Sequence, residues 1–185
     1  MIFTETTING IKFSPVTTAK DKHALREFFK KHYAEVSEDV FPSEDLEACY
    51  NSLIIKATDS SGRIVAGLLS CAPPLLAEKV LTEGTVGAMN RVKRLTFLDL
   101  IAVDFALEEA IYPDLLKLYK EASHQNGIKS IIGFTRELSY LSFKLEEADF
   151  KVLAPLEQAP MLQGIHWELP RNEPQDSTEW FYKLL

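Results

Sequence analysis

Three side chains in the middle of the chain have the chemistry to move protons. Asp99 lies inside the apolar run Phe97–Val103, where a carboxylate facing a cleft can act as a general base, directly or through a water molecule. Tyr112 and Tyr140 follow, and each phenolic O–H can donate a proton. A structural role, with the Asp99 carboxylate bonded to backbone groups, is the commoner alternative.

The segment after this apolar run is a candidate anion site with unfavourable residues. Phe105–Asp114 leads into a helix that we expect to begin at Pro113. Free N–H groups and positive potential at a helix amino terminus suit phosphate. However, the segment has no glycine, Pro113 lacks an N–H, and Glu108 and Glu109 add like charge. These features weaken phosphate binding without abolishing it.

These residues lie within a strand–helix–strand–helix–strand order predicted between Leu95 and Val152. The pattern places two neighbouring strands in one sheet with a helix between them. Ligand sites in such sheets usually lie where the first strand leads into the first helix. The predicted elements are strand Phe97–Val103, a helix from Pro113, strand Ile131–Phe134, helix Glu137–Ala148 and an extended run from Phe150.

The rest of the chain adds strands and helices on both sides of this unit. Thr17 or Thr18 can cap a helix, and Asp59–Gly62 is typical of a hairpin turn. The predicted elements are strand Ile11–Val16, a helix to Val36, a helix from Ser43, strands Leu53–Thr58 and Arg63–Cys71, and strand Met161–Leu169. The fold class is therefore α/β of the mixed α+β kind, a single mixed, mostly antiparallel central sheet flanked by helices. We expect one domain over residues 1–170 and a C-terminal tail over 171–185.

The composition and charge of the chain limit the classes of partner that the protein can bind. The 185 residues carry a net charge of −7, which argues against a nucleic-acid binder. No apolar run is long enough to span a bilayer, and no signal peptide is visible, so we expect a cytoplasmic protein without a membrane partner. Two cysteines and four scattered histidines predict no metal site. The aromatic end Trp180–Leu185 can dock on the chain's own core, on a second copy as a homodimer, or on another protein.

The element order resembles that of the GCN5-related N-acetyltransferase superfamily from Ile11 to Leu169. The likeness is carried by Leu98–Asp104, Leu115–Leu116, Gly127–Gly133 and Leu145–Phe150. The resemblance implies an acyl-CoA N-acyltransferase-like fold. It also implies transfer of an acyl group from acetyl-CoA, or a related acyl-CoA, to an amine on a small molecule or a peptide.

The resemblance also implies where the ligand lies. The pantetheine arm would run along Phe97–Val103, where this strand splays from Ile131–Phe134. The implied cofactor-binding residues are Ile101, Ala102, Val103, Glu109, Ala110, Ile111 and Asp114.

The sequence departs from the family pattern at three places. The pyrophosphate loop is degenerate, because it lacks the usual glycines. Leu145 stands where many members have a tyrosine that acts as the general acid, and Asp149 stands where glycine is usual. The catalytic candidates are therefore Asp99, Tyr112 and Tyr140. The alternative function is a binding or regulatory module that has kept the scaffold and lost the chemistry.

Overall fold

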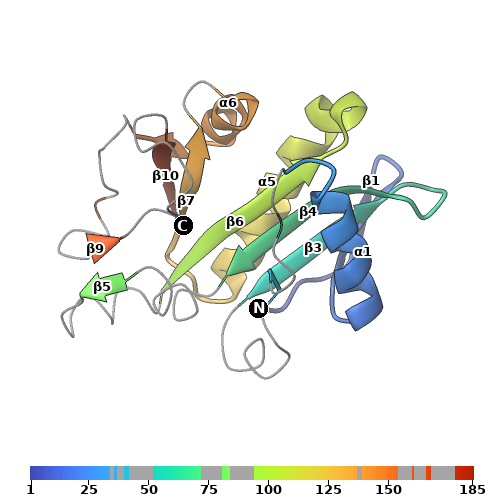
Figure 1. Cartoon of the computed structure of the whole chain (residues 1–185), viewed down its shortest axis with the longest axis horizontal. Coiled ribbons are helices and arrows are strands. Elements are labelled where there is room, and N and C mark those ends of the chain that lie inside the picture. Colours follow the sequence, from blue (N-terminus) through green and yellow to red (C-terminus); the bar gives the residue numbers. More distant parts are fainter. Residues whose placement is uncertain are drawn as a thin grey trace.

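A mixed eight-stranded sheet forms the centre of the protein (Figure 1). The computed structural model describes residues 1–33, 36, 40, 41, 52–71, 81–83, 94–136, 139–153, 160, 166, 167 and 178–185. In spatial order the strands are β1 (Thr6–Ile8), β2 (Ile11–Pro15), β3 (Leu53–Thr58), β4 (Ile64–Cys71), β6 (Leu95–Val103), β7 (Ser130–Arg136), β10 (Thr178–Leu184) and β8 (Lys151–Val152). β6 and β7 are parallel and the other neighbouring strands are antiparallel, so the predicted fold class is confirmed.

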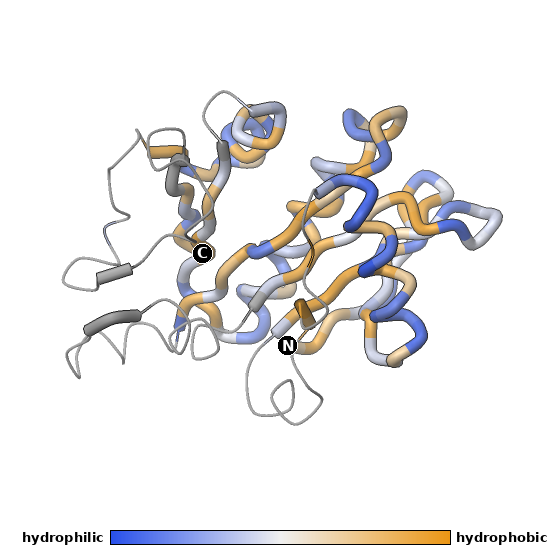
Figure 2. Tube along the Cα trace, viewed as in Figure 1, coloured by the Kyte–Doolittle hydropathy of each residue, from blue (hydrophilic) through white to orange (hydrophobic). Residues whose placement is uncertain are grey.

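Helices cover both faces of this sheet. α1 (Ala19–Phe29) packs on one face, where its apolar residues meet Ile54, Leu69 and Ala102. α5 (Glu108–Gln125) and α6 (Tyr140–Glu147) pack on the other. The central strands are mainly hydrophobic and the connecting turns mainly hydrophilic, as Figure 2 shows. The buried face of α5 is formed by Ile111, Tyr112, Leu115, Leu116 and Tyr119.

The β6 and β7 strands separate halfway along their length. They pair from Leu95 and Ser130 to Leu98 and Gly133, and both strands then continue beyond the last pair. The predicted divergence of these two strands is therefore confirmed, and it is visible in Figure 1. A Cβ at Gly133 would lie 2.8 Å from the Leu98 carbonyl oxygen, so a residue without a side chain is needed at the point of separation.

The first turn of α5 lies earlier in the chain than predicted. A 3₁₀ turn, η1 (Phe105–Leu107), leads into a helix that begins at Glu108 and contains Pro113 in its interior. The prediction of a loop up to Pro113 is thus wrong. Ile111 and Tyr112 are 2% and 5% exposed, whereas Pro113 is exposed. Burial of the two large side chains, about 1.5–3 kcal/mol each, offsets a proline cost of about 3 kcal/mol.

Residues 178–184, near the C-terminus, belong to the central sheet as β10. β10 pairs with β7 along its whole length and with β8 at Phe181 and Tyr182. Phe181 is 1% exposed and contacts the Phe150 ring edge-on. This end of the chain therefore packs on the chain's own core, and the division into residues 1–170 and 171–185 stays a prediction. The homodimer stays a prediction.

Two further predictions fall wholly or partly outside the described residues. The helix expected from Ser43 lies outside them. Of the expected strand Met161–Leu169, the structure describes β9 (His166–Trp167), which pairs with β5 (Leu81–Glu83) in a separate two-stranded sheet. β9 thus lies apart from the central sheet.

Candidate active site

A β-bulge places Asp99 at the point where β6 leaves β7. In the pairing of β4 with β6, Leu69 faces Leu100 and Ser70 faces Leu98, so Asp99 is the extra residue. A bulge bends its strand and redirects a side chain. Asp99 is exposed, while the residues on either side of it in β6 are half-buried or buried. This carboxylate is therefore directed away from the core, as a general base requires.

Beyond the bulge, the backbone of β6 offers hydrogen-bonding groups on the side away from β4. The Asp104 N–H donates to the Val65 carbonyl at 2.8 Å, so Ala102 also bonds toward β4 in an antiparallel ladder. Ile101 and Val103 alternate with these residues, and their N–H and C=O groups point to the side where β7 has diverged. Of the three predicted strand residues, Ile101 and Val103 can offer backbone groups to a ligand there, and Ala102 cannot.

Tyr33, in the turn after α1, contacts this edge of β6. Its hydroxyl donates to the Ile101 carbonyl at 2.5 Å and accepts from the Ile101 N–H at 3.3 Å. Burial raises the pKa of Tyr33 to about 12, with the nearby Asp99 charge a smaller cause. Tyr33 has no signal in the sequence, because a hydroxyl one turn beyond a helix end follows no characteristic spacing.

The two predicted tyrosines lie side by side. The rings of Tyr112, in α5, and Tyr140, the first residue of α6, have centroids 5.9 Å apart. Burial is the main cause of a strongly raised Tyr112 pKa, with smaller effects from Tyr33 and Glu108. A phenol in this state stays protonated at neutral pH and is a weaker proton donor than an ordinary phenol. Leu145, at the usual tyrosine position of the family, is fully buried.

Tyr140 is held by a charged cluster at the start of α5. Its hydroxyl donates to Glu109 Oε1 at 2.7 Å. Lys144 Nζ lies 2.7 Å from Glu109 Oε2, 2.8 Å from Glu147 Oε2 and 5.2 Å from the Tyr140 ring centroid. These carboxylates raise the pKa of Lys144, and Lys144 lowers that of Glu109. The hydroxyl proton of Tyr140 is therefore already used in the hydrogen bond to Glu109.

The predicted cofactor residues of α5 are not equivalent. Glu109 and Ala110 are exposed in the first turn, where N–H groups lack an intrahelical acceptor. Ile111 packs in the core. Asp114 lies in the second turn, where the regular helix uses its N–H. Within α5, Glu109 and Ala110 remain candidates for phosphate contact, and Ile111 and Asp114 do not suit that role.

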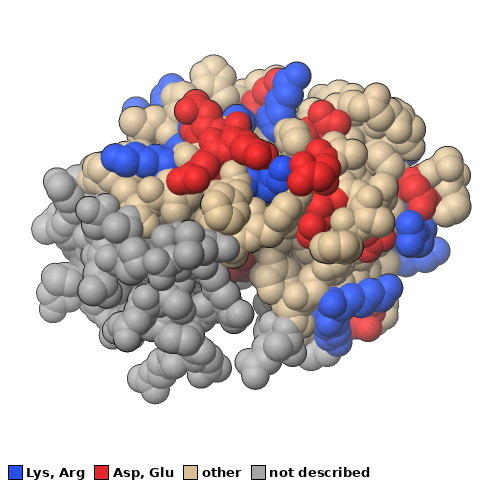
Figure 3. Space-filling model, turned by 90° about the horizontal axis from the view of Figure 1, so that it is seen from above, with Lys and Arg blue, Asp and Glu red and all other residues tan. Residues whose placement is uncertain are grey.

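Acidic side chains gather on the face seen from above in Figure 3, with basic ones among them. His32 Nε2 and Arg63 Nη1 lie 3.7 Å and 3.4 Å from the two carboxylate oxygens of Asp104 at the end of β6. Burial raises the pKa of Glu108. In the described part of the chain, no group of three or more His, Cys, Asp or Glu side chains is placed to hold a metal ion.

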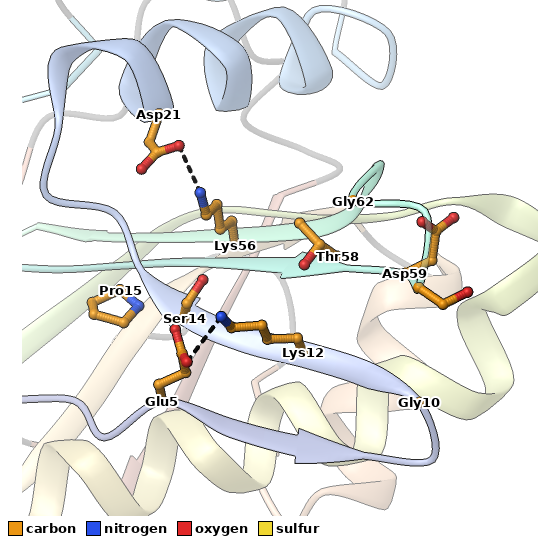
Figure 4. Close-up of a pocket in the computed structure, with 11 residues that line it drawn as sticks. Glu5, Gly10, Lys12, Ser14, Pro15, Asp21, Lys56, Thr58, Asp59 and Gly62 are labelled. Carbon is orange, nitrogen blue, oxygen red and sulfur yellow. Dashed lines mark hydrogen bonds and ion pairs between the residues drawn. The ribbon is translucent and has the colours of Figure 1, made fainter.

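A surface pocket of about 590 Å³ lies elsewhere, between the β1–β2–β3 edge and the start of α1 (Figure 4). Its lysines are paired, Lys12 with Glu5 at 2.9 Å and Lys56 with Asp21 at 2.6 Å. None of the residues that line the pocket belongs to β6 or β7, so the pocket is separate from the divergence of these two strands. No helix among the described residues is long and apolar enough to cross a membrane.

Comparison with known proteins identifies the architecture. No protein-family model and no curated protein matches the sequence. Among solved structures, the GNAT domain of S. lividans PAT aligns with a TM-score of 0.63 and 14% identity, over 95% of this chain and 90% of that one. The Drosophila melanogaster polyamine N-acetyltransferase aligns with a TM-score of 0.58 and 14% identity, over 95% and 100%.

A GCN5-related N-acetyltransferase from Kribbella flavida aligns with a TM-score of 0.57 and 11% identity, over 95% of this chain and 98% of that one. These three structures span nearly the whole chain, and they share the mixed sheet with helices on both faces. The protein has the fold of the GCN5-related N-acetyltransferases.

Proposed function

We propose that the protein transfers an acyl group from acetyl-CoA, or a related acyl-CoA, to an amine. The observation that carries this proposal is the separation of β6 from β7 after Leu98, at the Asp99 bulge. The separation leaves an edge of β6 that can bond an extended, amide-containing ligand. Two structures of the same fold are named as enzymes for amines, a polyamine N-acetyltransferase and an arylalkylamine N-acetyltransferase-like protein.

The residues present fit an acyl-CoA in part. Backbone groups of Ile101 and Val103 would bond the pantetheine arm, and the first-turn N–H groups of Glu109 and Ala110 would face its phosphates. Lys144 supplies a cation beside that turn. An acyl-CoA, when bound, supplies the acyl group as an activated thioester. The carboxylate of Glu109 lies at the same turn and weakens phosphate binding there.

The proton transfers are assigned to side chains around the bulge. Asp99 accepts the proton of the attacking amine, directly or through water, because it is exposed at the divergence. Tyr112 is 5% exposed and its pKa is strongly raised by burial, so it is a weak donor to the leaving sulfur. Tyr140 is a second donor that first has to leave Glu109. The net charge of −7 favours a cationic amine through long-range attraction.

Titration calorimetry with acetyl-CoA and CoA tests the binding step, and thiol release in the presence of a panel of amines tests the chemistry. We expect heat at submillimolar ligand and thiol release with at least one amine. Asp99→Asn should keep the affinity for acetyl-CoA and lower thiol release by about 10²–10⁴-fold, the usual contribution of a general base. The absence of heat at submillimolar ligand would contradict the proposal.

A second candidate function is a binding or regulatory module without catalysis. The acidic first turn of α5 and the buried Leu145 favour it, because both remove groups that the family uses. This candidate predicts heat with CoA and no thiol release with any amine in the panel. The two readouts together therefore separate the two functions.

A further inference from the structure

Tyr33 forms a two-point contact with a single residue of β6. One hydroxyl both donates to the Ile101 carbonyl and accepts from the Ile101 N–H. A neighbouring strand, or an extended amide, would bond to the same pair of groups. Tyr33 thus satisfies the backbone of β6 at the place where β7 no longer does.

The contact lies where the proposed ligand would lie. Ile101 is two residues beyond the bulge at Asp99 and three beyond the last pair with β7 at Leu98. Its backbone groups point away from β4, as the ladder requires. An arm that runs along this edge of β6 must compete with the hydroxyl for Ile101, because the N–H has one hydrogen to donate and the hydroxyl lies against both the N–H and the carbonyl.

The position of Tyr33 is set by the turn that ends α1. The Tyr33 N–H donates to the Phe29 carbonyl at 2.9 Å, and the Tyr33 ring meets the Phe29 ring edge-on with centroids 6.3 Å apart. Phe29 is fully buried and fixes the base of the turn. The Tyr33 side chain is half-buried and packs at the edge of the core cluster that contains Phe29, so it is not enclosed within that cluster.

We infer that Tyr33 is an autoinhibitory residue whose hydroxyl occupies the Ile101 backbone groups in the free protein and must be displaced by the pantetheine arm of an acyl-CoA. This inference rests on the proposed function. Each binding event must break two hydrogen bonds before it makes new ones. The contact therefore lowers the affinity for ligands that carry the arm, and leaves the affinity for the nucleotide alone unchanged.

The test compares Tyr33→Phe with the wild-type protein by titration calorimetry against two ligands. CoA carries the pantetheine arm, and adenosine 3′,5′-bisphosphate lacks it. We expect Tyr33→Phe to bind CoA about tenfold more tightly, equivalent to about 1.4 kcal/mol, and to bind the bisphosphate as the wild type does. Hydrogen exchange at the Ile101 amide should be faster in free Tyr33→Phe than in the free wild type.

Tyr119→Phe is the matched control. It removes a buried tyrosine hydroxyl that donates to Ser70 Oγ at 3.0 Å, away from the Ile101 edge. This variant should lose stability and keep wild-type CoA affinity. Equal CoA affinity in Tyr33→Phe and wild type overturns the inference and leaves the proposed function intact. A parallel gain for both ligands also overturns it, and no binding of CoA by either protein overturns both proposals.

Discussion

The ammonium group of Lys144 lies 2.7 Å from Oε2 of Glu109 at the first turn of α5. The Lys144 side chain is 8% exposed, whereas Glu109 is 78% exposed and also accepts the hydroxyl of Tyr140. A turn that reads as purely acidic in the sequence therefore has a fixed cation beside it. A phosphate approaching this turn would compete with the Glu109 carboxylate for Lys144.

Glu109→Gln should therefore increase the affinity for CoA. The substitution removes a negative charge at the helix amino terminus and leaves Lys144 less neutralised, which we expect to strengthen binding about two- to fivefold at low salt. Calorimetric titration with CoA at low and high salt measures the effect, which should shrink as salt rises. Glu121→Gln, an exposed carboxylate farther along the same helix, is the matched control, and an equal gain there would refute the local explanation.

Asp149→Gly should stabilise the fold relative to Asp149→Ala by about 1 kcal/mol. Asp149 has φ 63°, and it ends α6 with bonds from its own N–H to Glu146 and from the Phe150 N–H to Leu145. This left-handed position is the reason that glycine suits the site. Urea unfolding of the two variants gives the difference.

Asp149 also forms an ion pair with Lys183 of β10, which the two substitutions remove equally. Lys183→Met measures the contribution of this pair, which we expect to be small because Asp149 is 86% exposed. Equal stability of the alanine and glycine variants would rule out the backbone explanation.

The β3–β4 hairpin should contribute a pH-dependent part of the stability. Asp59 accepts from Ser61 and from the Arg63 N–H, and these bonds, with that from the Ser61 hydroxyl first, lower its pKa from 3.8 to about 2. Because the pKa is lower in the folded state, the stabilisation is present above about pH 4 and is lost as the pH falls through about 2.

Asp59→Asn, which keeps an oxygen acceptor and cannot ionise, is the probe for this effect. Urea midpoints measured between about pH 5 and pH 2 should show the wild type more stable than the variant at the upper end, with the difference shrinking toward the lower end. A difference that stays constant across this range would show that the carboxylate charge is not the cause.

Local pattern was sufficient for most of the central elements. Alternation and apolar runs predicted β2, β3, β4, β6 and β7 within one or two residues, and Thr18 does cap α1 by accepting from the Asp21 N–H at 3.1 Å. The separation of β6 from β7 was predicted from the family resemblance. The bulge that directs the Asp99 side chain was not predicted, because it depends on the register of β6 with β4.

Contacts between distant segments explain what the sequence did not predict. Pro113 was assigned to the helix start because proline suits that position locally, but the burial of Ile111 and Tyr112 extends α5 upstream. Tyr33 reaches Ile101 across 68 residues. Residue spacing within one element predicts neither the early start of α5 nor the contact of Tyr33 with Ile101. Each depends on which face of the sheet a helix covers.

The C-terminal strand should be essential for folding, and Phe181→Ala tests this directly. Phe181 is 1% exposed, contacts Phe150 and fills the space left by the missing side chain of Gly133. Truncation of such a residue costs about 3–5 kcal/mol, which we expect to appear as a lower urea midpoint. Leu184→Ala, on the same strand but at a 63% exposed position, should change stability little. A loss in Phe181→Ala no larger than that in Leu184→Ala would contradict the packing of Phe181 as the source of this stability.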